Sequence, residues 1–208
     1  ETFQLSWPDG RTETFHIWDY AFLYRHPGLY KQLIVDQLNC QVYQAITAVL
    51  AQSVDATTPL KVLDIACGSG LMGETLKNSG HFNIDYLAGV EISSEAIDAL
   101  RREQIGVYDD SLLLGQDDVD SLGEKNINCM TLCGAANHLT LQDYQYYLSL
   151  LDKSAYVIFN LQLAADKPQR QQILQWMDSH YQLLRRQVYP HRKLSNGEIV
   201  EHEVFLYQ

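Results

Sequence analysis

One stretch of the chain, residues 62–70, limits the folds open to it more than any other, and it reads Val-Leu-Asp-Ile-Ala-Cys-Gly-Ser-Gly. Its apolar start predicts a buried strand. Gly68 and Gly70 predict a sharp turn after that strand, because a residue without a β-carbon adopts turn conformations easily. A helical pattern follows from Leu71, and the next apolar run ends in Glu91. The stretch therefore predicts the first strand, turn and helix of a parallel α/β sheet.

The acidic and glycine positions of this unit predict a ligand site. Open α/β sheets bind ligands beyond the carboxyl ends of their strands, which is where Gly68 and Glu91 would both lie. Backbone N–H groups at the turn and at the start of the following helix favour a carboxylate or phosphate. A carboxylate at Glu91 would accept hydrogen bonds from two ribose hydroxyls. The pattern is therefore typical of a site for a nucleoside cofactor.

Strands and helices alternate along most of the remaining sequence, which predicts a parallel sheet with right-handed crossovers. We expect strands at residues 60–65, 84–92, 112–114, 127–133 and 155–161, and helices at 71–78, from 93 or 94, at 141–151 and from 168 to about 180. The last two strands, 181–190 and 198–207, are joined through Ser195-Asn196-Gly197. Asn-Gly is a strong turn signal, so these two strands are expected to pair antiparallel.

The N-terminal segment has a different pattern. Residues 3–15 contain a Pro-Asp-Gly turn between short alternating runs and predict a β-hairpin. Residues 17–50 have a helical pattern that Pro27-Gly28 breaks into two helices. We expect a single domain over residues 1–208, with the hairpin and helices in residues 1–59 and the ligand-binding core in residues 60–208.

Composition narrows the expected partners. A formal net charge of -11 argues against nucleic acid, because binding to phosphates relies on Lys and Arg. No apolar run has the length of a membrane span, and no signal-like segment begins the chain. The four cysteines and the histidines other than His138 lack metal-ligand spacing. These observations predict a cytoplasmic protein with no metal site, no nucleic-acid partner and no membrane partner.

The motif that begins at Asp64 resembles the first motif of the class I S-adenosylmethionine-dependent methyltransferases, which reads acidic-x-Gly-x-Gly-x-Gly. Glu91 matches the acid that ends their second strand, and the antiparallel last strand matches their topology. Ala66 departs from the pattern, since the family has its first glycine there. The resemblance covers about residues 60–207. It implies a Rossmann-like, mostly parallel seven-stranded sheet with helices on both faces, an antiparallel C-terminal strand, and an N-terminal hairpin and helical lid.

Two other readings remain open at this point. Gly68, Gly70 and Gly73 also fit the Gly-x-Gly-x-x-Gly spacing of a nicotinamide-dependent oxidoreductase. That fingerprint asks for no acid at Asp64, so the methyltransferase reading is favoured. The other alternative is a catalytically silent methyltransferase-like domain that serves as an interaction module. The acids at both strand ends, Asp64 and Glu91, argue against it.

The resemblance implies S-adenosyl-L-methionine as the cofactor and methyl transfer by direct displacement. The residues expected at the cofactor are Asp64, Ala66, Gly68, Gly70, Glu91, Ile92, Asp117 and Cys133. Ile92 would pack on the adenine face, unless it fills the core. Asp117 would bind the adenine amino group, with Gln116 and Asp118 as alternatives and a solvated acidic loop as the competing interpretation.

The acceptor side is expected at residues 133–139, which resemble the loop between cofactor and acceptor in small-molecule methyltransferases. The Asn-Pro-Pro-aromatic signature of DNA and protein amino-methyltransferases is absent, so a small-molecule acceptor is expected. Asn137 would contact the acceptor. His138 is the candidate catalytic residue, with stabilisation of the loop as its alternative role.

An aromatic stripe in the N-terminal helices comprises Trp18, Tyr20, Tyr24 and Tyr30. Most such stripes belong to the core. The segment before the first strand is commonly a lid over the acceptor in the family, however, so Tyr20 and Tyr30 are candidate substrate contacts.

Overall fold

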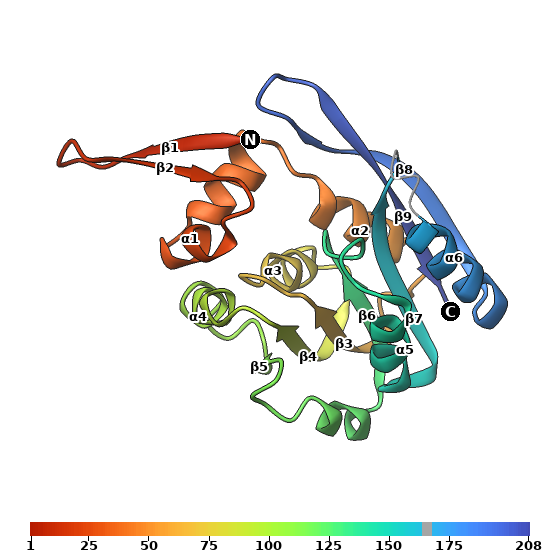
Figure 1. Cartoon of the computed structure of the whole chain (residues 1–208). Helices are drawn as coiled ribbons and strands as arrows, with labels where there is room; N and C mark the ends of the chain where they lie inside the picture. Colours follow the sequence, from red (N-terminus) through yellow and green to blue (C-terminus); the bar gives the residue numbers. More distant parts are fainter. Residues whose placement is uncertain (164–167) are drawn as a thin grey trace.

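The computed structural model of the chain describes residues 1–163 and 168–208, which form a seven-stranded sheet and a separate two-stranded hairpin (Figure 1). The strands of the sheet, in spatial order, are β5 (Asp110–Leu113), β4 (Asn83–Glu91), β3 (Pro59–Ile65), β6 (Ile127–Leu132), β7 (Leu151–Gln162), β9 (Ile199–Tyr207) and β8 (Leu183–Lys193). Strands β3 to β7 pair in parallel, and β9 lies antiparallel between β7 and β8. The predicted sheet with its antiparallel C-terminal strand is confirmed.

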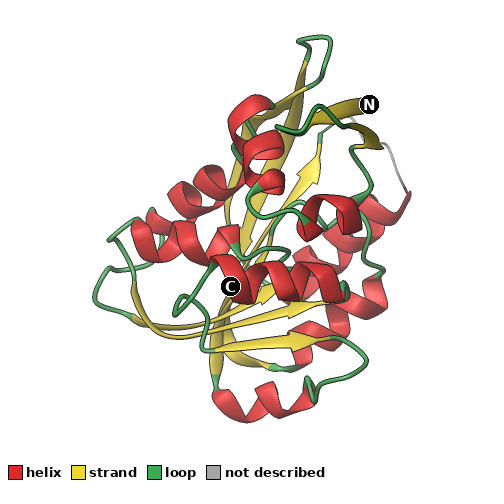
Figure 2. Ribbon diagram, turned by 90° about the vertical axis from the view of Figure 1, so that its left-hand side faces the viewer, coloured by secondary structure: helices red, strands yellow, loops and turns green. Residues whose placement is uncertain are grey.

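Helices cover both faces of this sheet (Figure 2). One face packs against α2 (Val42–Ala51) and α3 (Leu71–Asn78), and the small cluster around Cys67 packs against α4 (Ser94–Glu103). The other face packs against α5 (Leu141–Ser149), α6 (Pro168–His180) and the 3-10 helix η2 (Asp120–Lys125). Neighbouring residues of β3 illustrate the division, since Val62 belongs to the first core and Leu63 to the second.

Local sequence signals set most of the helix starts. The Ser93 side chain accepts a hydrogen bond from the backbone N–H of Ala96, which caps α4. Thr140 and Asp143 form a reciprocal capping box at the start of α5. Gly70, with a left-handed φ of 82°, begins α3. These signals explain why the predicted starts of α3, α4 and α5 lie within about one residue of the observed ones.

The N-terminal segment consists of the hairpin β1 (Thr2–Ser6) and β2 (Thr12–His16), α1 (Tyr20–Arg25) and the π-helix η1 (Lys31–Gln37), followed by α2. The prediction of two helices over residues 17–50 is wrong, because the helical pattern breaks a second time near Asn39, which has a φ of 53°. Backbone groups at this break pair with β8 instead. Lys193 donates to the Leu38 carbonyl at 2.7 Å, and Gln41 donates to the His191 carbonyl at 2.8 Å.

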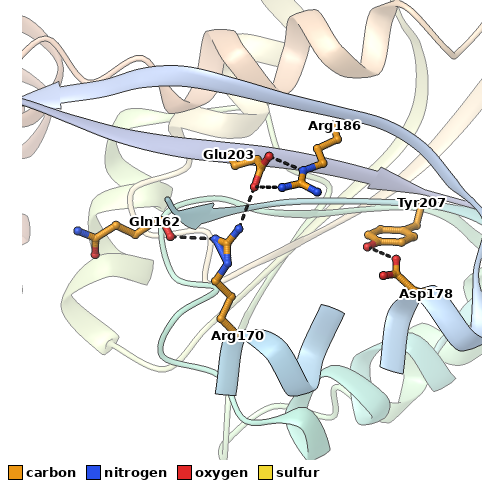
Figure 3. A network of polar contacts seen from close by, with 6 residues as sticks. All are labelled: Gln162, Arg170, Asp178, Arg186, Glu203 and Tyr207. Atoms are coloured by element: carbon orange, nitrogen blue, oxygen red, sulfur yellow. Dashed lines mark hydrogen bonds and ion pairs between the residues drawn. The ribbon is translucent and has the colours of Figure 1, made fainter. Parts of the chain in front are cut away.

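Helix α6 is attached to the last strands of the sheet by a partly buried ionic network (Figure 3). Arg170 of α6 donates to Glu203 of β9 at 2.8 Å and to the Gln162 carbonyl at 2.9 Å. Arg186 of β8 also binds Glu203, whose side chain is only 3% exposed. The network therefore joins one helix to three neighbouring strands. None of the described helices is both long and apolar enough to cross a membrane.

Candidate functional site

The turn between β3 and α3 uses left-handed backbone three times. Gly68 and Gly70 have φ values of 54° and 82°, and Ala66 has a φ of 52°. Glycine adopts this region without penalty, whereas alanine is strained there. The sequence departure at Ala66 therefore keeps the turn geometry but carries local strain.

Glu91 is fixed against this turn. One carboxylate oxygen accepts from the Gly68 N–H at 2.9 Å, and the other accepts from the N–H groups of Ile92 at 2.7 Å and Ser93 at 3.0 Å. The residue is 8% exposed. A carboxylate has about four acceptor positions, so three are occupied and one remains for a ligand without rearrangement. The end of β4 and the glycine turn are thereby held as one unit.

Asp64 lies beneath the turn and is 1% exposed. Its carboxylate accepts hydrogen bonds from the hydroxyls of Tyr108 and Thr131, both at 2.7 Å. Burial raises the pKa of Asp64 to about 7, although these two hydrogen bonds oppose the rise. Since Tyr108 also accepts from the Gly73 N–H at 3.0 Å, a chain of two hydrogen bonds connects Asp64 to the first turn of α3.

Tyr108 was missed by the sequence analysis. A β-carbon at Gly73 would lie 2.6 Å from its ring, and one at Gly70 would lie 2.9 Å from it. Packing against Tyr108 therefore favours glycine at both positions, and at Gly70 the left-handed φ of 82° favours it as well. A lone tyrosine between a helix and a short strand carries no local signal that would have identified it.

Tyr24 of α1 reaches the glycine turn from the N-terminal segment. A β-carbon at Gly68 would lie 2.6 Å from the Tyr24 hydroxyl oxygen. Tyr24 is 8% exposed. Its ring stacks on Tyr20, with centroids 6.1 Å apart, and tilts against Tyr30 at 4.9 Å. The aromatic stripe is thus one cluster, whose inner member faces the turn.

The two candidate substrate contacts lie further out in this cluster. Tyr20 is 38% exposed and its ring centroid is 6.3 Å from that of Tyr30. The Tyr30 hydroxyl is 3.5 Å from that of Tyr43 in α2. Burial raises the pKa of both Tyr20 and Tyr30, so both side chains are neutral phenols near neutral pH.

The residues expected around adenine occupy the edge of the same region. Ile92 is 75% exposed, so it does not fill the core and its side chain is free to pack on a ligand. Asp117 is exposed, and its carboxylate accepts from the Leu113 N–H at 2.7 Å at the end of β5. Asp117 therefore stabilises its own turn and has further acceptor positions available.

The loop after β6 carries the remaining predicted site residues, Cys133, Asn137 and His138, and they do not all lie on the same side of the sheet. The Cys133 sulfur is 3.1 Å from the sulfur of Met72 in α3, on the same side of the sheet as the glycine turn. Asn137 lines a small crevice with Gln169 and Arg170 of α6. His138 is exposed, and its side chain makes no hydrogen bond with the described residues. Among the described residues, no hydrogen bond joins Asn137 or His138 to Tyr20 or Tyr30, whose contacts include each other and, for Tyr30, Tyr43.

A buried polar group at the carboxyl end of β7 was not expected from the sequence. The imidazoles of His191 and His202 stack with centroids 3.7 Å apart and an interplanar angle of 7°. The Gly134 N–H donates to Asn160 Oδ1 at 2.8 Å, which leaves Asn160 Nδ2 to donate to His202 Nδ1 at 2.7 Å. The proton of neutral His202 is therefore on Nε2.

Both of these imidazoles are neutral near pH 7. Burial, followed by the neighbouring His202 and Arg192, lowers the pKa of His191 to about 3. Burial, followed by Arg192 and Arg170, lowers the pKa of His202 to about 4. A hydrogen bond that His202 accepts at Nδ1 acts in the same direction, because a protonated ring would have to give it up.

Two further features lie outside this site. A groove of about 520 Å³ between η1, α2 and α3 is lined by none of the residues expected at the cofactor or the acceptor. Within residues 1–163 and 168–208, no group of three or more His, Cys, Asp or Glu side chains is arranged to hold a metal ion.

No protein-family model and no curated protein sequence matches the chain, whereas many solved structures do. A candidate class I S-adenosylmethionine-dependent methyltransferase from Listeria monocytogenes is 11% identical, with a TM-score of 0.58 over 80% of this chain and 59% of that one. The ribosomal protein L11 methylase of Lactobacillus delbrueckii subsp. bulgaricus is 19% identical, with a TM-score of 0.53 over 81% of this chain and 78% of that one. A candidate RNA methyltransferase from Pyrococcus horikoshii is 14% identical, with a TM-score of 0.53 over 81% of each chain.

The chain has the class I methyltransferase fold. The expectation drawn from the motif at Asp64 and from the antiparallel last strand is thereby confirmed at the level of fold. Its topology places the glycine turn and Glu91 at the carboxyl ends of β3 and β4, where open α/β sheets bind ligands.

The residues of this methyltransferase fold fit a nucleoside cofactor. Ser69 Oγ, within the glycine turn, is buried and has no hydrogen-bond partner among the described residues. Buried polar atoms are normally paired, so a ligand at the turn is a natural partner for it. Gly68 lets the Tyr24 hydroxyl approach the turn, since a β-carbon there would lie 2.6 Å from the hydroxyl oxygen. Glu91 is held in place with one acceptor position remaining.

The expectation that nucleic acid is excluded as a partner is wrong for this fold, because a candidate RNA methyltransferase shares it. That expectation rested on the formal net charge of -11. Net charge is a sum over the whole molecule, whereas contacts with phosphates depend on where individual Lys and Arg side chains lie. An acidic total therefore carries no conclusion about a local surface.

Proposed function

We propose that this protein is an S-adenosylmethionine-dependent methyltransferase. The observation that carries the proposal is the fixed pairing of Glu91 with the Gly68 N–H, which joins an acid and a glycine turn at the ligand-binding edge of the sheet. In a nicotinamide-binding domain the sheet has no need of an antiparallel strand between β7 and β8. The names of the matched proteins support methyl transfer over hydride transfer.

In this proposal Glu91 accepts a ribose hydroxyl, Ile92 and Asp117 lie at the adenine, and the turn at Ala66, Gly68 and Gly70 receives the amino-acid end. Asp64 lies beneath the turn and positions the start of α3 through its hydrogen bond with Tyr108. S-adenosyl-L-methionine carries its methyl group on a sulfonium and so supplies an activated donor. The protein then has to bind, orient the acceptor and exclude water.

The acceptor side, in this proposal, lies above Cys133 and the Asn160–His202–His191 group. The N-terminal segment is hydrogen-bonded to β8 beside this group, through Leu38 and Gln41. The absence of an Asn-Pro-Pro-aromatic signature after β6 supports a small-molecule acceptor. We keep Tyr20, Tyr30, Asn137 and His138 as proposed contacts, with His138 as the proposed catalytic residue, and the four free cysteines support a reducing compartment such as the cytoplasm.

Calorimetry with S-adenosylhomocysteine and NAD at matched concentrations tests the cofactor. We expect binding of S-adenosylhomocysteine alone. Glu91→Gln should weaken it about tenfold or more, since a hydrogen bond to a charged group contributes about 1.5–3 kcal/mol. Glu124→Gln, an exposed carboxylate on η2, is the matched control and should bind as the wild type does. Heat from NAD with none from S-adenosylhomocysteine would reject the methyltransferase assignment.

Transfer of a labelled methyl group tests the acceptor. The protein would be incubated with methyl-labelled S-adenosylmethionine and, separately, with a small-metabolite extract, with RNA oligonucleotides and with a protein extract. Label in the small-molecule fraction supports the proposed acceptor class. Label that accumulates only in RNA or only in protein would contradict the small-molecule acceptor and identify RNA or protein as the acceptor. The assignment of the cofactor would still stand.

A further inference from the structure

The hydroxyl of Tyr24 has an unusual environment for a buried polar group. It lies against Gly68, where a β-carbon would be only 2.6 Å away. The residue is 8% exposed. The neighbouring Tyr30 hydroxyl contacts it and also lies 3.5 Å from the Tyr43 hydroxyl. The Tyr24 hydroxyl therefore lies at the part of the turn that receives the cofactor in the proposed function, where a ligand oxygen would be within its reach.

This hydroxyl is a donor near neutral pH. Burial, followed by the neighbouring Tyr30 and the Glu91 carboxylate, raises the pKa of Tyr24 well above its ordinary value. Tyr24 therefore presents an O–H group at the glycine turn, next to Gly68, whose N–H donates to Glu91.

The main chain around Tyr24 is anchored, so its position is not that of a loose lid. Arg102 of α4 donates to the Tyr24 carbonyl at 3.0 Å and is paired with Glu103 at 2.6 Å. Glu103 in turn accepts from the Gly28 N–H at 3.1 Å, just beyond α1. Two alanines of α4, Ala96 and Ala99, pack beneath the ring. Helix α4 thus holds both the ring and the chain that carries it.

We propose that the Tyr24 hydroxyl is a cofactor-binding donor, so that the N-terminal segment is part of the nucleoside site and not only of the acceptor site. This inference rests on the proposed function. The group that Tyr24 would bind is an oxygen acceptor of the cofactor, either a ribose oxygen beside Glu91 or the carboxylate at the amino-acid end.

The test is Tyr24→Phe, which removes the hydroxyl and keeps the ring, measured with the full chain and S-adenosylhomocysteine. We expect the dissociation constant to rise about five- to thirtyfold, as for loss of one hydrogen bond to a polar or charged group. The melting temperature without ligand should stay close to that of the wild type, because the ring and its packing on α4 are kept. Tyr43→Phe is the matched control, a tyrosine of the same cluster that should bind within twofold of wild type.

A Tyr24→Phe variant that binds S-adenosylhomocysteine as the wild type does would overturn this inference and leave the proposed function standing. A folded wild type that binds neither S-adenosylmethionine nor S-adenosylhomocysteine would overturn both. Titration with 5′-methylthioadenosine, which lacks the amino-acid end, separates the two acceptors. An equal loss for both ligands assigns a ribose oxygen, and a loss confined to S-adenosylhomocysteine assigns the carboxylate.

Discussion

At the scale of single residues, hydrogen bonds hold the turn after β3 although Ala66 stands where the methyltransferase motif has a glycine. The turn keeps its left-handed geometry at Ala66 although the residue is not glycine, with a φ of 52°. Glu91 and the Tyr108 hydroxyl each accept hydrogen bonds from backbone N–H groups of the turn or of α3. These hydrogen bonds hold the strained turn in place, because they satisfy N–H groups that no helix or strand pairs.

Ala66→Gly should raise the free energy of unfolding by up to about 1 kcal/mol, since alanine is disfavoured by about 1–2 kcal/mol in left-handed backbone and glycine loses part of this gain to chain entropy. Thermal denaturation without ligand measures it. Ala88→Gly in the middle of β4, where the backbone is extended and fully buried, is the control and should lower the melting temperature. A lower melting temperature for Ala66→Gly would contradict the assignment of strain to this position.

At the scale of elements, α6 is attached to the sheet by one buried acid that serves two arginines. The Glu203 side chain is 3% exposed, that of Arg170 13% and that of Arg186 58%. Both guanidinium groups also lie over the Phe205 ring, at 5.6 and 5.5 Å from its centroid. If Glu203 is removed, the buried Arg170 guanidinium is left as an unpaired charge, which is strongly destabilising. The exposed Arg186 guanidinium can instead be hydrated by water.

Glu203→Ala should therefore destabilise the protein by about 3–5 kcal/mol, because it leaves Arg170 buried without its counter-charge. Arg186→Ala should cost about 1 kcal/mol or less, as for exposed ion pairs. Urea denaturation of both variants gives the two values. Equal losses in the two variants would show that leaving the buried Arg170 without its counter-charge costs nothing further, which would contradict the role assigned to burial.

At the scale of the whole molecule, the N-terminal segment is joined to the β8–β9 hairpin. Glu1 accepts from Arg192 at 2.8 Å and from the Ser195 N–H at 2.6 Å, so the N-terminus is tied to the β8–β9 hairpin. The same two strands carry the stacked pair of His191 and His202. Two neutral imidazoles therefore lie buried in this part of the molecule.

Stability should fall as pH decreases from about 6.5 to about 4, because unfolded histidines bind protons in that range while folded His191 and His202 do not. Each contributes a slope of up to about 1.4 kcal/mol per pH unit. Asp64, with its pKa raised to about 7, acts in the opposite direction, because only the folded state keeps its proton between about pH 4 and 7. The contribution of one histidine is therefore measured as the difference in pH dependence of the unfolding free energy between a variant and the wild type.

His191→Phe should lower the pH slope of the unfolding free energy by about one proton between pH 6 and 4.5. Val204→Ala, a buried and non-titrating neighbour on β9, should lower stability and leave the slope unchanged. Urea denaturation across this pH range gives both slopes. The same slope in His191→Phe and in the wild type would mean that His191 is already protonated in the folded protein.

The sequence by itself determined the order of strands and helices, the turn at Gly68 and Gly70, and the position of Glu91 at the end of its strand. These features follow from hydrophobic period, glycines and capping residues, which act within a few residues of the chain. The antiparallel hairpin at the C-terminus was equally accessible, because Asn-Gly specifies its turn locally. Sequence also supplied the right fold family, since the motif at Asp64 is short and contiguous.

Only the tertiary structure decided which side chains come into contact around these strands and the glycine turn. Tyr24 reaches Gly68, Tyr108 reaches Asp64, and His191 stacks on His202, although each pair is separated by helices, strands or a hairpin in the sequence. No local pattern encodes such contacts, because they depend on how the N-terminal segment and β8 pack over the sheet. The second helix break near Asn39 has the same origin, since its backbone groups pair with β8 and not within a helix.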